Sequence, residues 1–266
     1  MLGSILPEEA LEVVERERDL LGRIRDFVET FEPDGEEIQR IDELIRHLDE
    51  MFLLVVVGEV KAGKSAFINA LLREEVCPEG PLPLTDRVHV LGYGEKSTES
   101  DVEPFILRRT VPVETLERMN VVDTPGTNSP VKRHQEITEG FLPRADIVFF
   151  VTSIDCPLTQ TELELLGSIR RRWRKEVACI LAKVDIHPDK DREVVLDYLH
   201  RSFREHLDFD PVIFPVSAHQ ARRAREEGDE ELLEASGLPA VERYIVENLS
   251  EGRRVALKLS SPLGAA

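Results

Sequence analysis

Hydrophobic and polar residues alternate along this chain in two distinct patterns. Residues 11–48 carry apolar side chains at steps of three and four, which places them on one face of an α-helix. The stretch Glu-Pro-Asp-Gly at residues 32–35 interrupts the pattern, so we expect two amphipathic helices joined by a turn. From residue 52 onward, short apolar runs alternate with amphipathic segments, which is typical of strands and crossover helices in a largely parallel sheet.

The apolar runs locate the expected strands, and the amphipathic segments locate the helices. Buried strands are predicted at residues 52–57, 120–122, 147–151, 177–181 and 212–216. Two half-polar segments, 87–93 and 101–109, predict an antiparallel pair at the edge of the sheet. Helices are expected after residue 63 and at about 131–141, 159–172, 192–205 and 238–249. Thr159 begins a Thr-Gln-Thr-Glu capping box, and the acidic segment 224–237 predicts a solvated connection.

Composition and charge narrow the functional classes. The 266 residues include 52 acidic and 34 basic ones, a formal net charge of −18 at pH 7. Such a chain repels nucleic acid and anionic lipid on average, so we expect no nucleic-acid partner, and membrane contact only through a local patch or other segments. The three cysteines lack metal-ligand or redox spacing, and no apolar run reaches the roughly 18–20 residues of a membrane span. The N-terminus has no apolar core of the kind found in signal peptides. We therefore predict that the chain is cytoplasmic.

One loop carries a pattern with a defined chemistry. Residues 58–65 read Gly-Glu-Val-Lys-Ala-Gly-Lys-Ser, directly after an apolar strand and before a helix. This is the phosphate-binding pattern G-x-x-x-x-G-K-[ST], in which glycines turn backbone N–H groups onto an anion, lysine binds the terminal phosphates and the hydroxyl binds Mg²⁺. The predicted nucleotide-binding residues here are Gly58, Glu59, Val60, Lys61, Ala62, Gly63, Lys64, Ser65 and Ala66.

Two further segments complete a magnesium and phosphate site. Asp123 and Gly126 lie in Asn-Val-Val-Asp-Thr-Pro-Gly, at the end of a second buried strand. A carboxylate there can hold Mg²⁺ through water, and the N–H of the glycine can contact a terminal phosphate. Thr85, between the two loops, is the candidate whose hydroxyl binds Mg²⁺ and whose N–H detects the terminal phosphate. The predicted metal ligands are therefore Ser65, Thr85 and Asp123.

The base-binding residues are predicted near the C-terminal end of the sheet. Lys183 and Asp185 follow the strand at 177–181. A carboxylate that accepts from N1–H and the exocyclic amine selects guanine, because adenine offers no matching donor pair. The lysine stem would cover the ring, and the backbone of Ser217 and Ala218 would face the guanine O6.

These motifs, in this order, resemble the GTPase domain of the dynamin superfamily, in particular its bacterial dynamin-like branch. The segments that carry the resemblance are GEVKAGKSAFINALL, PLPLTDRVHVLGYGE, VVDTPGTNSPVKRHQEIT, FLPRADIVFFVTSIDCPLTQTE, LAKVD and the closing SGLPAVERYIVENLSEGRRVALKLSSPLG. The resemblance implies a P-loop GTPase domain at 49–250, a helical neck-like segment at 1–48 and the start of a truncated neck or stalk helix at 251–266. It implies weak GTP binding, activation when two domains dimerise across the nucleotide, and membrane remodelling by the full-length protein.

Two departures from the family pattern concern the base site and the length. Ala182 stands where the family has Asn or Thr, which removes a side-chain tie to the phosphate loop and should loosen the guanine site. The sequence stops where the family continues into a helical stalk, so we interpret it as an excised domain, with a natural short form as the alternative. Membrane contact, peripheral in the full-length protein, would then come from segments absent here.

Hydrolysis requires an oriented water and compensation of charge on the transferred phosphoryl group. Thr127 stands where Ras-like proteins carry glutamine, so we assign water positioning to the backbone of Thr85. Lys61 lies where related GTPases carry an internal arginine or a residue that binds a monovalent cation, K⁺ or Na⁺. We expect Lys61 to supply positive charge in cis, the alternative being a solvent-facing lysine. The predicted catalytic residues are Lys61, Lys64 and Thr85.

The sequence favours a Mg²⁺-dependent GTPase that forms a homodimer through its nucleotide-binding face. The main alternative is a nucleotide-dependent switch or scaffold with little hydrolysis, because of the missing glutamine and Ala182. A ribosome-assembly GTPase is a third alternative, which the acidic charge disfavours because RNA binding normally requires a basic surface.

Overall fold

The computed structural model describes residues 8–30, 38, 41–42, 51–79, 87–103, 105–126, 140–173 and 177–249. Three predictions lie outside these residues: Thr85, most of the helix expected at 131–141, and the segment 251–266. Only three residues of the second N-terminal helix are described.

The described chain divides into two compact units, residues 53–243 and residues 1–52 with 244–266. The smaller unit contains α1 (Glu8–Glu29), an amphipathic helix as the apolar periodicity predicts. Its exposed apolar side chains, Leu20, Ile24 and Phe27, recur at the helical period. Among the described residues, no helix combines the length and apolarity needed to cross a membrane.

A single eight-stranded sheet organises the larger unit, in the order β3-β4-β2-β5-β1-β6-β7-β8. Its strands are β1 (Phe52–Val57), β2 (Val88–Tyr93), β3 (Thr98–Glu103), β4 (Ile106–Val111), β5 (Met119–Asp123), β6 (Ile147–Ser153), β7 (Val177–Ala182) and β8 (Ile213–Val216). The strands β1, β6, β7 and β8 run parallel, whereas β2 pairs antiparallel with β5. This mixed, mostly parallel sheet confirms the predicted fold class.

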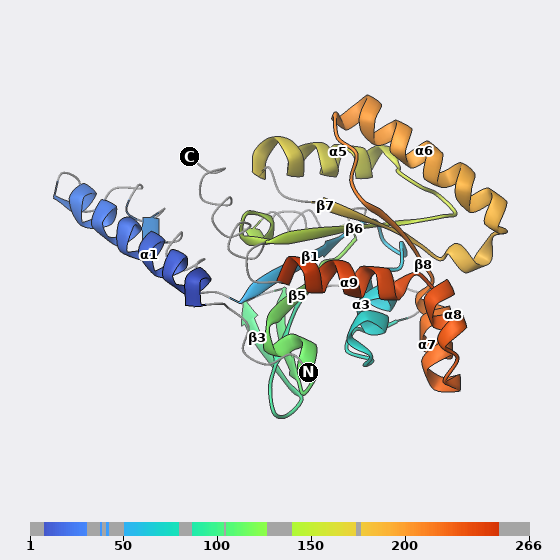
Figure 1. The fold of residues 1–266 in the computed structure, drawn as a ribbon, viewed down its shortest axis with the longest axis horizontal. Helices are drawn as coiled ribbons and strands as arrows, with labels where there is room; N and C mark the ends of the chain where they lie inside the picture. Colours follow the sequence, from blue (N-terminus) through green and yellow to red (C-terminus); the bar gives the residue numbers. More distant parts are fainter. Residues whose placement is uncertain are drawn as a thin grey trace. The chain divides into compact units, whose positions relative to one another are not determined.

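Helices cover both faces of the sheet. They are α3 (Lys64–Leu72), α5 (Gln160–Ser168), α6 (Asp189–Leu207), α7 (Ala218–Glu227), α8 (Glu230–Ala235) and α9 (Leu238–Leu249), with one π-helical turn at Ile169–Trp173 and short 3₁₀ turns at Glu114–Glu117, Leu142–Arg144 and Val184–Ile186. In Figure 1, α5 and α6 lie on one side of the sheet and α3 lies on the other. This layering is the expected arrangement for crossover helices between parallel strands.

The central strand β6 shows why both faces are covered. All of its residues are buried, which is the pattern of a strand covered on both sides. Phe149 packs edge-on against Phe67 of α3, with ring centroids 5.6 Å apart. Its neighbour Phe150 points to the opposite face, because side chains alternate along a strand.

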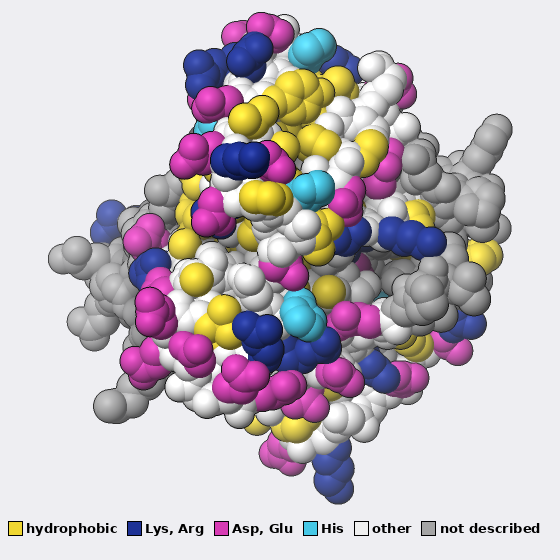
Figure 2. Space-filling view, turned by 90° about the vertical axis from the view of Figure 1, so that its right-hand side faces the viewer, with side chains coloured by type: hydrophobic (Ala, Val, Ile, Leu, Met, Phe, Trp, Pro, Cys, Tyr) yellow, Lys and Arg dark blue, Asp and Glu magenta, His cyan; other side chains and the backbone are white. Residues whose placement is uncertain are grey.

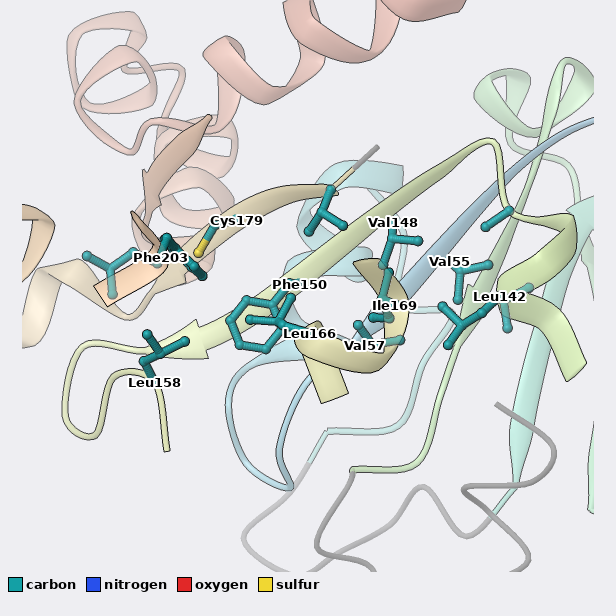
Figure 3. Close-up of a cluster of buried hydrophobic side chains, with 14 of the residues drawn as sticks. Val55, Val57, Leu142, Val148, Phe150, Leu158, Leu166, Ile169, Cys179 and Phe203 are labelled. Carbon is teal, nitrogen blue, oxygen red and sulfur yellow. The ribbon is translucent and has the colours of Figure 1, made fainter. Parts of the chain in front are cut away.

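The face that carries Phe150 contains a large apolar core, shown in Figure 3. Leu166 of α5, Phe203 of α6 and the π-turn residue Ile169 pack there against side chains of β1, β6 and β7. The burial of these side chains holds α5 and α6 on the sheet and so fixes the loop that precedes α5.

Two sequence predictions about local structure are wrong. The segments 87–93 and 101–109 do not form an antiparallel pair, because β2 pairs in parallel with β4 while the antiparallel edge pair is β3 with β4. The acidic segment 224–237 is not a connection: Gly228 ends α7 with a φ of +70°, and the Asp229 carboxylate accepts a hydrogen bond from the N–H of Leu232 to begin α8.

We expect Phe150→Ala to lower the free energy of unfolding by about 3–5 kcal/mol, because it removes a fully buried ring and leaves a cavity in this core. Val194→Ala, at a site that is 67% exposed, is the control and should change stability by about 0.5 kcal/mol or less. Urea unfolding followed by circular dichroism measures both. Equal stabilities of the two variants would contradict the packing described here.

Candidate functional site

The phosphate loop begins and ends with glycines whose backbone no other residue adopts without strain. Gly58 has a φ of +150°, and a Cβ atom there would lie 2.1 Å from the carbonyl oxygen of Val151. Gly63 has a φ of +110° and is the N-cap of α3. Between them, the N–H of Ala62 donates to the carbonyl of Glu59 at 3.2 Å. The loop therefore turns back on itself at the N-terminus of α3, where backbone N–H groups favour an anion.

Lys64 is the first residue of α3, directly after this loop, and is 6% exposed. Its Nζ donates to the carbonyl oxygens of Gly58 and Glu59, at 3.1 and 2.8 Å. Burial lowers the pKa of Lys64, and the nearby carboxylate of Asp123 opposes this shift. A buried ammonium that donates to backbone carbonyls is well placed to bind a phosphate, and the nearby carboxylates of Asp123, Glu162 and Glu59 favour its charged form.

Asp123, at the end of β5, faces the first turn of α3. Its Oδ2 accepts a hydrogen bond from the Ser65 hydroxyl at 3.1 Å. The carboxyl group is fully buried, and its Oδ1 has no hydrogen-bond partner among the described residues. Burial raises the pKa of Asp123, so the isolated carboxylate is electrostatically unfavourable. A hydroxyl and an incompletely bonded carboxylate are a donor set that fits Mg²⁺.

The segment after Asp123 lies directly against the phosphate loop. The Thr124 hydroxyl donates to the carbonyl of Val56 at 2.8 Å, which ties this segment to β1. A Cβ atom at Gly126 would lie 2.2 Å from the backbone nitrogen of Val60, so only glycine fits there. The structure thus brings together Gly126, Val60, Ser65 and Asp123, which the sequence predicts as parts of one site.

Lys61 is exposed and has a φ of +65°, an uncommon conformation for a residue with a side chain. The structure places it on the loop, between Val60 and Ala62. Thr85, the other predicted catalytic residue besides Lys61 and Lys64, lies outside the described residues.

Sequence reasoning missed a partly buried link between the phosphate loop and α5. The Thr159 hydroxyl donates to Oε1 of Glu59 at 2.5 Å, and the backbone N–H of Thr159 donates to Oε2 of Glu162 at 3.0 Å. The Thr152 hydroxyl donates to the same Glu162 oxygen at 3.1 Å. The capping box confirms the sequence pattern, but nothing in that pattern shows that its threonine also binds the phosphate loop.

The predicted base-binding residues lie at the ends of β7 and β8. Lys183 has a φ of +62° and precedes a 3₁₀ turn that contains the exposed Asp185. The Nζ of Lys183 lies 3.7 Å from Oδ2 of Asp155, which also accepts from the Ser153 hydroxyl at 3.1 Å. Asp155 therefore lies within ion-pair distance of Lys183, a contact that no sequence pattern indicated.

Ser217 and Ala218 are placed at the start of α7, but with different roles. The N–H of Ser217 donates to the carbonyl of Ser236, and its hydroxyl accepts from the N–H of Gln220 as the N-cap. The backbone N–H of Ser217 is thus already used. Ala218 lines, together with Ala66, a hollow of about 830 Å³ between α3 and α7, a size typical of small-molecule sites.

The arrangement matches a known family. Residues 54–106 and 99–184 match the sequence model of the dynamin family. A protein of Arabidopsis thaliana named probable transmembrane GTPase FZO-like, chloroplastic, is 35% identical in an alignment of 222 residues that covers 80% of this chain. The chain belongs to the dynamin family. This confirms the resemblance drawn from the sequence motifs.

Two further dynamins are similar over most of the chain. Dynamin-like protein 1 of Campylobacter jejuni is 22% identical and covers 84% of this chain. A solved structure of an oligomerised bacterial dynamin pair superposes with a TM-score of 0.69 at 19% identity, covering 98% of this chain and 46% of that one, which supports the fold. This dynamin-family chain spans only 24% and 40% of the two curated relatives.

Charges of both signs are mixed on the surface of this dynamin-family domain. Figure 2 shows basic side chains lying among acidic ones on one face, with acidic side chains prominent along its lower part. The described hollow between α3 and α7 repeats this pattern, since Arg73 and Arg222 line it together with Glu74 and Glu75. Neither surface forms the continuous basic stripe that nucleic-acid binding normally uses.

Glu162 gives a prediction for pH dependence. Burial is the largest cause that raises its pKa from 4.5 to about 7, so the folded state binds a proton more tightly than the unfolded chain. Relative to Glu162→Gln, the wild type should therefore lose stability as pH rises from about 4.5 to about 7, by up to about 3 kcal/mol. Urea unfolding of both proteins across this pH range measures the difference. A difference that does not change with pH would contradict the assignment.

Proposed function

We propose that the chain is a Mg²⁺-dependent GTPase that hydrolyses GTP to GDP and phosphate, and is activated when two nucleotide-binding faces meet. The observation that supports this best is the pair of buried charges, Lys64 in the phosphate loop and Asp123 opposite Ser65. Burial disfavours both charged forms, so a bound phosphate beside the lysine and a cation beside the carboxylate would stabilise the site.

In this proposal, the phosphate loop from Gly58 to Ala66 binds the phosphates through its backbone N–H groups. Lys64 would exchange its bonds to loop carbonyls for bonds to the terminal phosphates. Mg²⁺, held by Ser65, Asp123 and Thr85, would neutralise charge on the phosphates. The N–H of Gly126 would contact the terminal phosphate from the opposite side, next to Val60.

Base selection is assigned to Asp185 and Lys183. The exposed carboxylate of Asp185 would accept from the guanine N1–H and amine, while Asp155 positions the lysine stem over the ring. We assign the hydrogen bond to the guanine O6 to the backbone N–H of Ala218, because the N–H of Ser217 already donates to the carbonyl of Ser236. Ala182 lies near Gly63 of the phosphate loop, but its methyl group offers no hydrogen bond to that loop, so this region should hold the base less tightly.

For hydrolysis, we assign water positioning to the backbone of Thr85 and a positive charge near the β,γ-bridging oxygen to Lys61. K⁺ or Na⁺ is the alternative source of that charge. Formation of a homodimer across the nucleotide would close the phosphate loop over the bound nucleotide. Such a dimer agrees with the similar solved structure of an oligomerised bacterial dynamin pair, which is described as tethering membranes. Coupling to membrane remodelling, from a cytoplasmic or peripheral position, would require segments outside this chain.

The domain boundaries proposed with this function are a neck-like segment at 1–48, the GTPase domain at 49–250 and the beginning of a further helix at 251–266. The exposed apolar face of α1 supports a role for the first segment in helix packing.

Phosphate release from GTP and from ATP tests the proposal. It is measured over a range of protein concentrations with Mg²⁺, in K⁺ and in Na⁺. We expect specific activity to rise with protein concentration for GTP alone. Tight GTP binding with slow turnover that does not depend on concentration would instead indicate the nucleotide-dependent switch.

Lys61→Ala should lower turnover at saturating GTP by about tenfold or more, because it removes a charge needed only as the transition state forms. The affinity for GTP should change little. Lys190→Ala, an exposed lysine on α6, is the matched control and should leave both quantities unchanged. Unchanged concentration-stimulated turnover of Lys61→Ala would exclude the assigned role.

A further inference from the structure

Behind the proposed magnesium site, three side chains that can bind metal ions meet in the interior. Cys77, His89 and Asp123 each place one ligand atom, a sulfur, a ring nitrogen and a carboxylate oxygen, within 4.8 Å of the other two. All three residues are at most 8% exposed. Burial and the neighbouring carboxylate of Asp123 raise the pKa of the Cys77 thiol. These residues come from three separate segments and show no metal-ligand spacing in the sequence.

The backbone holds the three positions firmly. His89 and Asp123 are directly opposed in the antiparallel ladder between β2 and β5. Cys77 is fixed by the buried Asn69 of α3, whose Oδ1 accepts from the N–H of Cys77 at 2.8 Å and whose Nδ2 donates to its carbonyl at 2.8 Å. Ligand positions set by a strand ladder and a double hydrogen bond need little reorganisation to bind an ion.

The donor set differs from that of the magnesium site next to it. Magnesium prefers oxygen ligands, whereas a thiolate and an imidazole favour Zn²⁺ and similar transition metals. We propose that Cys77, His89 and Asp123 form a site for a thiophilic divalent metal of the Zn²⁺ class, which shares Asp123 with the proposed magnesium site. The fully buried Oδ1 of Asp123 has no hydrogen-bond partner among the described residues, so it is an acceptor that a cation bound beside Cys77 and His89 would use.

The spacing requires only a small adjustment. Zinc bonds of about 2.0–2.3 Å place two ligand atoms of one tetrahedral ion about 3.3–3.8 Å apart. The three ligand atoms here lie within 4.8 Å of one another, so side-chain shifts of about 1 Å would bring them to that spacing. Binding would convert the Cys77 thiol to the thiolate and release its proton to water, with no redox change. His89 also lines a surface hollow, in which Arg87 is paired with Asp101 and Arg109 with Glu99.

Sharing Asp123 gives the site a regulatory consequence, which rests on the proposed function. A carboxylate engaged by Zn²⁺ on its inner side is less available to Mg²⁺ beside Ser65. Occupancy by Zn²⁺ should therefore inhibit GTP hydrolysis, and added Mg²⁺ should oppose the inhibition.

Cobalt binding tests the site without relying on activity. The full chain carries Cys156→Ser, which removes the exposed thiol, and is titrated with Co²⁺ in the absence of nucleotide. We expect one bound Co²⁺ with a thiolate-to-cobalt charge-transfer band, which Zn²⁺ abolishes by displacement. Cys77→Ser should lose the band, and His89→Asn should bind at least about tenfold more weakly. His200→Asn, on the exposed surface of α6, is the matched control and should bind normally.

The outcomes separate this site from the proposed function. A band that persists unchanged in Cys77→Ser, or equal affinity in His89→Asn, overturns the site. If Cys77→Ser does not fold, as judged by circular dichroism, the His89→Asn titration alone decides.

Zinc inhibition of phosphate release that is lost in Cys77→Ser supports the shared carboxylate, whereas zinc binding without inhibition overturns it. A chain that binds Co²⁺ as expected but never hydrolyses GTP would refute the proposed function and leave the metal site standing.

Discussion

Two opposite charges buried beside each other are the constraint on which the rest of this domain depends. Lys64 and Asp123 cannot be solvated by bulk water, so the surrounding backbone must supply their partners. For Lys64 these partners are carbonyls of its own loop, which is possible only because Gly58 and Gly63 adopt positive φ. For Asp123 the hydrogen-bond partner is the Ser65 hydroxyl, and Oδ1 has no partner among the described residues. The charges are therefore only partly compensated, which is the state expected of a site built to receive a charged ligand.

The sheet order explains how this arrangement is held in place. β1 lies between β5 and β6, so the phosphate loop after β1 is flanked by the loop that carries Gly126 and by the segment between β6 and α5. Each neighbour contacts it through a specific group: Gly126 reaches Val60, and Thr159 bonds Glu59. The packing of Leu166 and Ile169 on Phe150 keeps the start of α5 near the loop. A distant apolar core thus helps to position the phosphate site, because α5 can shift only if that core is disturbed.

The sequence predicted what depends on local pattern and failed where the structure depends on partners distant in the chain. Short-range spacing predicted the strand that precedes Gly58, the capping box at Thr159 and the helix at 238–249. The structure confirms each of these elements. The pairing of β2 in parallel with β4 depends on which strands become neighbours, which alternation of residues does not encode. The helix α8 was missed because its acidic composition suggested solvent, although Asp229 is a strong N-cap. Asp155 and Glu59 gained their roles only through contacts across the fold.

Cys77 illustrates the same limit at the level of chemistry. In the sequence it is one of three scattered cysteines, and the lack of spacing argues against a metal site. Spacing rules of that kind describe ligands that come from one hairpin or one helix. Here the ligand atoms come from the segment after α3, from β2 and from β5, and they meet because the ladder and Asn69 bring those segments together. A pattern along the chain cannot detect such a site. The same contacts place a sulfur next to Asp123, so in the proposed function metal selectivity and nucleotide chemistry would depend on one side chain.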